Sequence, residues 1–560
     1  MKILNHNQNV IKILQKTLDE FNKLKSKKVS VIIKGSYVLK LKNIIDRTPN
    51  DIDLFFLNNE NLSTKREFIH FLTKKLKANI NREDDNLITI QTSNYGKIEF
   101  ILFESIDESL IEKIDKNIFI TNIDFLFLGK IFMLNYVMSK YYLHNDKNEK
   151  IQTALLDLIN ISKKTNFFEN YQISHLKKNI YNLINNSTFI YIYYKYEDFL
   201  WWKTEYLNFE LKNEEQQQML QKIALFFEEI DKDQEIKNYI ELNKQIIKSF
   251  YDGFINQILE KYNIISPSGN EQIFINQIFD NIAKSEGAFK LENNNSNLVF
   301  LSHCDEVMGI LLNGNIYNSG NIIWQKSNDL NVFDSTGKLI SENLAFKSND
   351  DYVFSAEKNI KINKPRIELI NHNLDELFSK SAKTPFYVVS NEKPAVKNFN
   401  LLSRNHDNKI NVFVLKWLRE NTKKVPNIFL TNSEEIGLKG IKETKKLIGE
   451  QKICINLEVS QWNKWENHNL LIRVADSFTP LNNKILEKVT KIFEKFSIPY
   501  KLYYGSGSTD ISEISESHNG ITIAIPADFI HTMKSKISIL NLVYMMKITR
   551  ILNEEFNKND

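Results

Sequence analysis

Seven acidic or imidazole residues in the second half of the chain lie at the expected ends of strands or directly before an expected helix. They are His303, Asp305, Asp407, Glu434, Glu435, Glu458 and His531. Open α/β sheets gather such groups at the carboxyl ends of their strands. Two imidazoles and three carboxylates, one of them bridging, suffice to hold a pair of zinc-like ions. The pattern therefore predicts a two-metal site with one glutamate to spare.

The adjacent Glu434 and Glu435 in "FLTNSEEIGLKG" are predicted to have different roles in this site. Neighbouring residues on an extended chain point to opposite sides, so one can hold metal while the other stays free. A free carboxylate beside two metals can take a proton from metal-bound water and return it to a leaving amine. We therefore expect Glu434 to be the base and Glu435 to be a ligand.

These motifs, in this order, resemble those of the co-catalytic metallo-aminopeptidases of the glutamyl aminopeptidase and tetrahedral aminopeptidase kind. The resemblance spans about 254–555 and includes "SPSGNE" at 266–271 and "GSTD" at 507–510. It implies removal of N-terminal residues from a peptide substrate, with two divalent ions, Zn²⁺ or Co²⁺, as cofactors. The implied metal ligands are His303, Asp407 as the bridge, Glu435, Glu458 and His531. By the same resemblance Asp305 orients His303 and Glu434 is the catalytic base.

The sequence departs from this family at three places. Glu458 stands where an aspartate is more usual, Cys304 where a methionine is usual, and Asn408-Lys409 where Asp-Arg is usual. Each site residue also has a structural explanation of its own. An aspartate before a helix can cap it, a late histidine can be buried against backbone, and paired glutamates can form a solvated loop.

A second group of carboxylates lies near the N-terminus, around the stretch "KGSYVLKLKNIIDRTPNDIDLFF" at 34–56. Asp51 and Asp53 are two residues apart on an expected strand and therefore project from the same face. Glu99, a charge among alternating apolar residues, is expected on a neighbouring strand. Such carboxylates can hold Mg²⁺ between protein and nucleotide phosphates. The alternative is a strand end with solvated aspartates.

This N-terminal stretch, about 25–105, resembles the nucleotidyltransferase superfamily, particularly the minimal and abortive-infection type enzymes. Their pattern is Gly-Gly/Ser, a helix, then Arg-Thr/Ser-x-x-Asp-x-Asp, and it is matched by Gly35, Ser36, Arg47, Asp51 and Asp53. The resemblance implies a Mg²⁺-dependent transferase that binds a nucleoside triphosphate through Gly35, Ser36 and Arg47 and passes a nucleotide to an unknown acceptor. A degenerate, inactive domain of the same fold is the alternative.

Two details qualify the second resemblance. Glu99 stands where the family more often has an aspartate. Lys130, early in the helical part that follows, is a further candidate for contact with phosphate, as a lysine there is in some relatives.

Three domains are predicted to position these residues in a multidomain α/β protein. They are a small mixed-sheet nucleotidyltransferase-like domain at 1–120, a helical domain at 121–250 and an α/β metallo-aminopeptidase-like domain at 251–560. The boundary near 250 rests on glycine and proline, which are concentrated after it. Short strands and turns at about 310–395, including Asn313-Gly314, predict an inserted β-domain. Residues 87–103 predict a hairpin that turns at 94–96.

The composition and the distribution of apolar residues indicate which kinds of partner the protein has. The 560 residues carry a formal net charge of +4 and are 42% hydrophobic and 25% charged, as in soluble globular proteins. The N-terminus lacks the apolar core of a secretory signal, and no window approaches a membrane-spanning run. We therefore expect a cytoplasmic protein without a membrane partner. Cys304 and Cys454 form no CxxC pair, so neither a disulfide framework nor a thiolate zinc site is indicated.

The combined prediction is a bifunctional enzyme, a dinuclear-metal aminopeptidase fused to a magnesium-dependent nucleotidyltransferase. Relatives of the resembled peptidases use inserted β-domains to assemble, so a homo-oligomer is also expected. The alternative, from another class, is that one or both domains are inactive and serve as a binding or assembly module.

Overall fold

The chain divides into two compact units. One comprises Met1–Asp252 with Lys495–Ile498, and the other comprises Gly253–Glu494 with Pro499–Asp560. The computed structural model describes residues 2–558 except 58–61, 85–86, 94, 103–105, 107, 145–148, 187–212, 281, 283, 286, 293–295, 313–314, 323, 325–329, 345, 349–366, 370–383, 450–451, 463–468, 477–478, 506, 515–518 and 533. A multidomain α/β protein with mixed sheets is confirmed.

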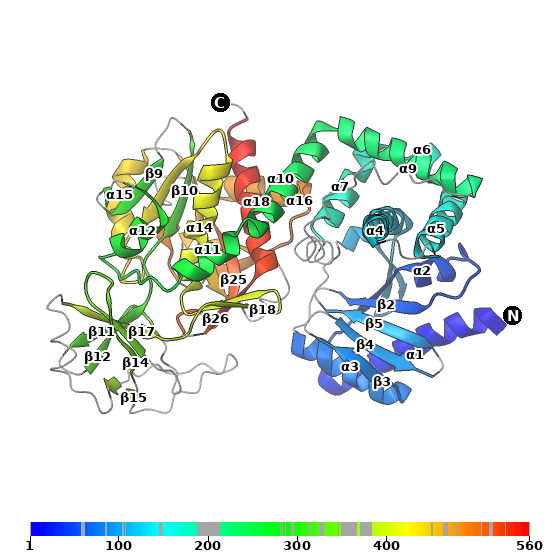
Figure 1. Ribbon diagram of the computed structural model, residues 1–560, viewed down its shortest axis with the longest axis horizontal. Helices are drawn as coiled ribbons and strands as arrows, with labels where there is room; N and C mark the ends of the chain where they lie inside the picture. The colour runs from blue at the N-terminus through cyan, green and yellow to red at the C-terminus, as the bar shows by residue number, and fades with distance from the viewer. Residues whose placement is uncertain are drawn as a thin grey trace. The chain divides into compact units, whose positions relative to one another are not determined.

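A seven-stranded mixed sheet forms the centre of the first unit, in the order β3-β4-β5-β2-β1-β7-β6. Figure 1 shows β2, β5, β4 and β3 following one another across it. Its strands are β1 Val31–Lys34, β2 Asp51–Phe56, β3 Asn79–Glu83, β4 Leu87–Thr92, β5 Gly96–Ile101, β6 Ile111–Asp115 and β7 Ile118–Thr121. β4 and β5 pair antiparallel, which confirms the expected hairpin, although Asn94 in its turn lies outside the described residues. β2 runs parallel to β5 and antiparallel to β1.

Alternation along β2 decides where its aspartates point. Ile52 and Leu54 are buried, whereas Asp51 and Asp53 are only partly covered. Because successive side chains of a strand point to opposite faces, the apolar pair enters the core and both carboxylates share the other face.

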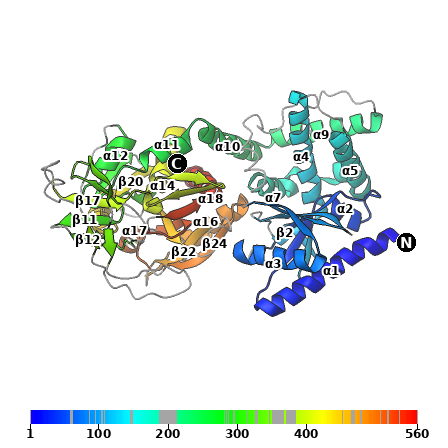
Figure 2. The same ribbon diagram turned by 60° about the horizontal axis from the view of Figure 1, so that its bottom comes forward.

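Helices are the other described elements of the first unit. They are α1 Lys2–Lys25, α2 Ser36–Leu41, α3 Leu62–Leu76, a 3-10 turn Glu108–Leu110, α4 Ile123–His144, α5 Glu149–Thr165, α6 Phe167–Asn170, α7 Ile173–Ile184, α9 Glu214–Lys232 and α10 Gln234–Tyr251. Of these, α1, α2 and α3 contact the sheet. α1 and α3 lie side by side (Figure 2), with the rings of Phe21 and Phe68 5.4 Å apart. α4 packs against α5, and α5 against α9.

A twelve-stranded sheet organises the second unit, with the main order β18-β19-β26-β25-β21-β10-β20-β9-β8. Its strands are β8 Lys284–Ser285, β9 Ala288–Glu292, β10 Leu298–His303, β18 Ala395–Lys397, β19 Asn400–Ser403, β20 Asn427–Thr431, β21 Ile453–Gln461, β22 Leu470–Asp476, β23 Thr479–Pro480, β24 Tyr500–Gly505, β25 Asn519–Asp528 and β26 Ser535–Ser538. The four central strands, β20, β10, β21 and β25, are parallel neighbours. Their carboxyl ends therefore meet at one edge.

The central strands are apolar along nearly their whole length. Every residue of β10 and β20 is buried, as expected for parallel strands covered on both faces. The helices among the described residues of this unit are α11 Phe254–Lys261, α12 Gln272–Ile278, α14 His406–Asn421, α15 Lys439–Ile448, α16 Asn483–Lys495, α17 Asp510–Ile514 and α18 Ile539–Phe556. α14 packs on β10 and β21 with α18 beside it (Figure 1).

A separate seven-stranded sheet, in the order β14-β13-β17-β11-β12-β16-β15, is inserted in the second unit. Its strands are β11 Met308–Leu312, β12 Asn315–Ser319, β13 Leu330–Phe333, β14 Leu339–Leu344, β15 Phe346–Ser348, β16 Ile367–Leu369 and β17 Phe386–Ser390. Leu311, Trp324, Leu330 and Val388 form part of its own core. The expected turn residues Asn313 and Gly314 lie outside the described residues.

Among the residues that the structure describes, no helix is both long enough and apolar enough to cross a membrane.

Candidate functional site

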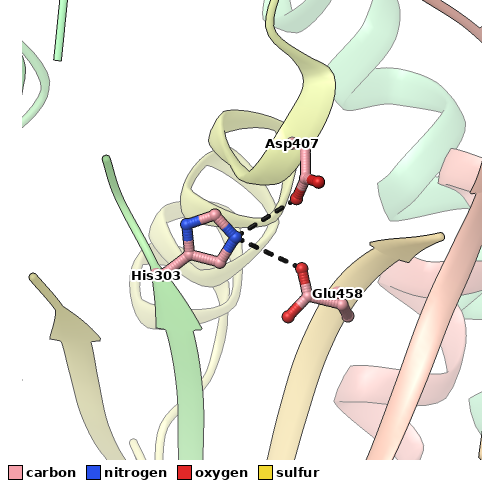
Figure 3. Close-up of side chains that lie close together, drawn as sticks. All are labelled: His303, Asp407 and Glu458. Atoms are coloured by element: carbon pink, nitrogen blue, oxygen red, sulfur yellow. Dashed lines mark hydrogen bonds and ion pairs between the residues drawn. The ribbon is translucent and has the colours of Figure 1, made fainter. Parts of the chain in front are cut away.

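Side chains from five separate segments of the second unit converge near the carboxyl ends of the central strands. His303 is the last residue of β10, and Glu458 lies on the adjacent β21. Asp407 comes from the start of α14, and Figure 3 shows it facing the same imidazole as Glu458. The sequence placed Glu458 at a strand end, but β21 continues for three residues to Gln461.

Two triads of donor atoms share one aspartate. In the first, His303 Nε2 lies 3.1 Å from Asp407 Oδ1 and 3.3 Å from Glu458 Oε1. In the second, His531 Nε2 lies 3.1 Å from Asp407 Oδ2 and 3.2 Å from Glu435 Oε1. Each triad offers three donor atoms within 4.8 Å of one another. The two oxygens of Asp407 therefore face two separate groups, as a bridging carboxylate requires.

The backbone at the start of α14 turns Asp407 away from a capping role. Its φ and ψ of −82° and 106° are not helical, and the same holds for Asn408. The Asn408 side chain donates to Leu457 O at 2.6 Å and so ties this turn to β21. The carboxylate contacts two imidazoles, so the helix-cap alternative does not describe its surroundings.

Asp305 fixes the glutamate pair as well as the imidazole. Its Oδ1 lies 3.3 Å from His303 Nδ1 and accepts the Glu434 N–H at 3.1 Å. Its Oδ2 accepts the Glu435 N–H at 3.2 Å and the Ser268 hydroxyl at 2.7 Å. Because Glu435 lies in a turn, the extended-chain argument for the different roles of the two glutamates was wrong. Backbone hydrogen bonds to one buried carboxylate set their directions instead.

Glu271 is a supporting residue to which the sequence assigned no role. It is fully buried, and its Oε1 accepts the backbone N–H of Ser433 at 2.9 Å and that of Gly269 at 2.7 Å. Carboxylates thus accept the N–H groups of three consecutive residues, Ser433, Glu434 and Glu435. The only signal in the sequence was its place at the end of the "SPSGNE" motif.

The charges of this site are poorly balanced without cations. Burial, together with the neighbouring carboxylates, raises the pKa of Glu434 well above its usual range and that of Glu458 to about 7. Burial alone would lower the pKa of His303, but the surrounding carboxylates outweigh it and raise that pKa. The pKa of Asp407 is lowered, since the His303 and His531 imidazoles outweigh its burial. Carboxylates outnumber imidazoles in a buried place, which favours bound cations.

The donor set fits a pair of divalent metal ions. Nδ1 of His303 is held by Asp305, so its Nε2 faces carboxylate oxygens that cannot donate to it. Glu435 Oε1 is buried without a well-formed hydrogen bond. Two ligand atoms at about 2.1 Å from one tetrahedral ion lie about 3.4 Å apart, close to the separations found here. Imidazole nitrogen with carboxylate oxygen suits zinc or cobalt.

A second candidate site lies in the first unit, where the sequence placed it. Carboxylate oxygens of Asp51, Asp53 and Glu99 lie within 4.8 Å of one another. β2 and β5 pair in the register that sets Asp53 opposite Glu99. Burial and its two acidic neighbours raise the pKa of Asp53 to about 7. Gly35, with φ of 73°, passes so close that a Cβ there would lie 2.3 Å from Asp53 Oδ2.

The other residues expected to bind nucleotide form one polar cluster. Arg47 donates to Ser36 Oγ at 3.0 Å, and Lys130 donates to the same oxygen at 3.1 Å. Both cations also bind Asp157 of α5, at 2.6 and 2.8 Å. Asp157 was missed, because "ALLDLIN" looks like any helix with one polar position and lies more than a hundred residues from Arg47.

The second unit is therefore an α/β structure that carries a candidate two-metal centre. Residues 354–548 match the model of the M42 glutamyl aminopeptidase family. The matched range contains Asp407, Glu434, Glu435, Glu458 and His531 but not His303 or Asp305, which the fold brings to them.

Several solved structures are similar to this chain. A TET aminopeptidase from a marine sediment archaeon of the Thaumarchaeota is 17% identical, with 54% of this chain and 96% of that chain covered and a TM-score of 0.47. An aminopeptidase from the archaeon Desulfurococcus kamchatkensis is 19% identical, with 55% and 96% covered and a TM-score of 0.47. The TET1 peptidase of Pyrococcus horikoshii, which can assemble into a tetrahedron or a large octahedral shell, is 18% identical, with 53% and 98% covered and a TM-score of 0.44. No curated protein matches the sequence.

Proposed function

We propose that the second unit is a dinuclear metallo-aminopeptidase that removes N-terminal residues from peptides. The observation that carries this proposal is the position of Asp407 between two triads, one completed by His303 and Glu458 and the other by His531 and Glu435. The family match over residues 354–548 supports it independently of the geometry.

The residues around the centre have distinct tasks in this proposal. Two Zn²⁺ or Co²⁺ ions, held by the five ligands, would supply Lewis acidity toward a peptide carbonyl and toward water. Glu434 lies within 4.8 Å of donor atoms of His303 and Glu435 but belongs to neither of the triads that share Asp407. In this proposal its carboxylate takes the proton of the attacking water and returns it to the leaving amine. Asp305 contacts Nδ1 of His303 and accepts the backbone N–H of Glu434. One carboxylate therefore fixes the position of a metal ligand relative to the catalytic base.

Metal analysis combined with a panel of aminoacyl fluorogenic substrates tests this proposal. The purified protein should contain divalent metal and hydrolyse at least one substrate, and chelation should abolish the activity until Zn²⁺ or Co²⁺ is returned. A metal-loaded protein that hydrolyses no member of the panel and no unblocked peptide would favour the binding or assembly alternative.

For the first unit we propose a magnesium-dependent nucleotidyltransferase. The specific observation in favour is the group of Asp51, Asp53 and Glu99 beside Gly35, since clustered carboxylates next to close backbone can hold Mg²⁺ and nucleotide phosphates together. Asp53→Asn should abolish transfer from labelled nucleoside triphosphates to a component of cell extract. It should leave peptide hydrolysis within about a factor of two, because the two sites share no residue and lie in separate compact units. A wild-type chain that binds no nucleotide with magnesium would refute this proposal.

We also propose a cytoplasmic homo-oligomer. The inserted sheet exposes large apolar side chains, with Leu312 50% and Tyr317 55% accessible, and such surface favours association. Light scattering should show an assembly larger than the 65.8 kDa chain, and a monomer at micromolar concentration would contradict this.

A further inference from the structure

A buried carboxylate from the helical part of the first unit lies under the residues expected to bind nucleotide. We propose that Asp157 is a positioning residue, which holds Ser36, Arg47 and Lys130 together as one binding face for the phosphate chain of a nucleoside triphosphate. The proposal rests on the nucleotidyltransferase function proposed above and extends its site to α4 and α5.

The contacts of Asp157 join three segments that are far apart in the sequence. Its Oδ2 accepts from Arg47 Nη2 at 2.6 Å, from Lys130 Nζ at 2.8 Å and from Ser36 Oγ at 3.0 Å. Its Oδ1 accepts from Arg47 Nε at 3.2 Å, so the guanidinium is held by both carboxylate oxygens. A forked contact of this kind fixes the plane of an arginine as well as its distance.

Exposure increases from Asp157 outward. The side chain of Asp157 is 2% accessible, that of Lys130 is 16% and that of Arg47 is 34%. The carboxylate therefore lies behind the two cations, and an incoming anion meets their outer sides first. Asp157 carries one negative charge against two positive ones, so the cluster keeps an excess positive charge for a ligand.

The cluster is adjacent to the acidic trio through two consecutive residues. Gly35 contacts Asp53 closely enough to leave no room for a side chain, and Ser36 next to it is bonded to Arg47, Lys130 and Asp157. A phosphate chain on the cationic face would thus lie beside the carboxylates that can hold Mg²⁺. This juxtaposition is why we assign the face to a triphosphate rather than to an unrelated anion.

Burial and contact geometry argue against a second role, in which Asp157 occupies the place of a phosphate and competes with it. A competing carboxylate would have to leave its contacts when the ligand arrives, yet Asp157 is enclosed and accepts four hydrogen bonds. The two roles predict opposite effects of removing its charge. Loss of a positioning residue weakens binding, whereas loss of a competitor strengthens it.

The test is calorimetric titration of the full-length protein with inorganic tripolyphosphate, without magnesium. Asp157→Asn should weaken binding by about 10-fold or more, the scale of one hydrogen bond to a charged group. Asp157→Glu, which restores the charge, should recover part of this loss. The matched control is Glu67→Gln, which removes a carboxylate from an exposed ion pair with Lys25 in the same unit and should bind like wild type.

Arg47→Lys covers the case in which Asp157→Asn does not fold. Arg47 is partly exposed, and lysine keeps its charge but cannot make the forked contact. Weaker tripolyphosphate binding with an unchanged melting temperature is expected. Binding that is unchanged in Arg47→Lys, or unchanged or tighter in Asp157→Asn, would overturn the proposal, as would a wild type that binds no tripolyphosphate. If wild type binds tripolyphosphate but transfers no nucleotide, the proposed transferase function is refuted, whereas the proposed phosphate-binding face is supported.

Discussion

Replacing Glu434 with glutamine should separate proton transfer from metal binding in the second unit. The turn that carries Glu434 is held by its backbone N–H, which Asp305 accepts at 3.1 Å, so the substitution leaves this hydrogen bond in place. Both triads that share Asp407 are complete without Glu434. The isosteric amide can still accept a hydrogen bond but cannot take up a proton. Metal content should therefore remain that of wild type while turnover falls.

The size of the effect follows from the role assigned to the side chain. General acid–base catalysis contributes about 10²–10⁴-fold, which corresponds to about 3–5 kcal/mol of transition-state free energy. Because the change removes a step in catalysis rather than a contact with bound substrate, it should appear in kcat and leave KM within a few-fold.

The assay measures metal per chain and steady-state hydrolysis of the best aminoacyl substrate on the same preparations. Glu420→Gln, in an exposed ion pair with Lys416 on α14, is the matched control and should keep both values. Glu435→Gln should lose metal as well as activity, since it removes a donor of the second triad. If Glu434→Gln lost its metal, or kept wild-type turnover, the assignment of the two glutamates would be wrong.

Three further predictions concern other residues of the second unit. Asp407→Ala should lower metal content more than Glu435→Gln, because Asp407 serves both triads; equal losses by metal analysis would contradict a bridge. Glu271→Ala frees the Ser433 N–H and should lower kcat by roughly 10–100-fold with metal retained, whereas unchanged kcat would remove it as a support of Glu434. Burial lowers the pKa of Lys547 to about 7, so between about pH 7 and pH 10 this lysine is protonated in the unfolded chain but not in the folded one, and the free energy of unfolding rises with pH. In urea titrations at several pH values, Lys547→Met should reduce this slope by up to about 1.4 kcal/mol per pH unit. Parallel stability curves for wild type and variant would refute this prediction.

Local hydrophobic patterns in the sequence were enough to predict the strands that carry the candidate metal ligands. His303 was expected at the end of a strand, and it is the last residue of β10, which is buried throughout. The alternation around Asp51 and Asp53 predicted a shared face, which β2 confirms. Such patterns are local, so they survive without knowledge of the tertiary structure.

The directions of individual side chains depended on contacts that spacing does not encode. Glu434 and Glu435 are oriented by Asp305, which lies more than a hundred residues earlier in the chain. Asp157 reaches Ser36 and Arg47 only in the folded unit, where α5 packs against α4 and its carboxylate contacts the start of α2. A single polar residue on an apolar helix carries no periodic signal, so its partner can be found only once the fold is known.

The most direct test of the two-metal account is titration of metal-free protein with Zn²⁺ or Co²⁺, with bound metal and aminopeptidase activity followed together. The structure predicts two ions per chain, since Asp407 offers one oxygen to each triad, and it predicts activity that returns as they bind. Saturation at one ion per chain, or full activity in the metal-free protein, would contradict the account.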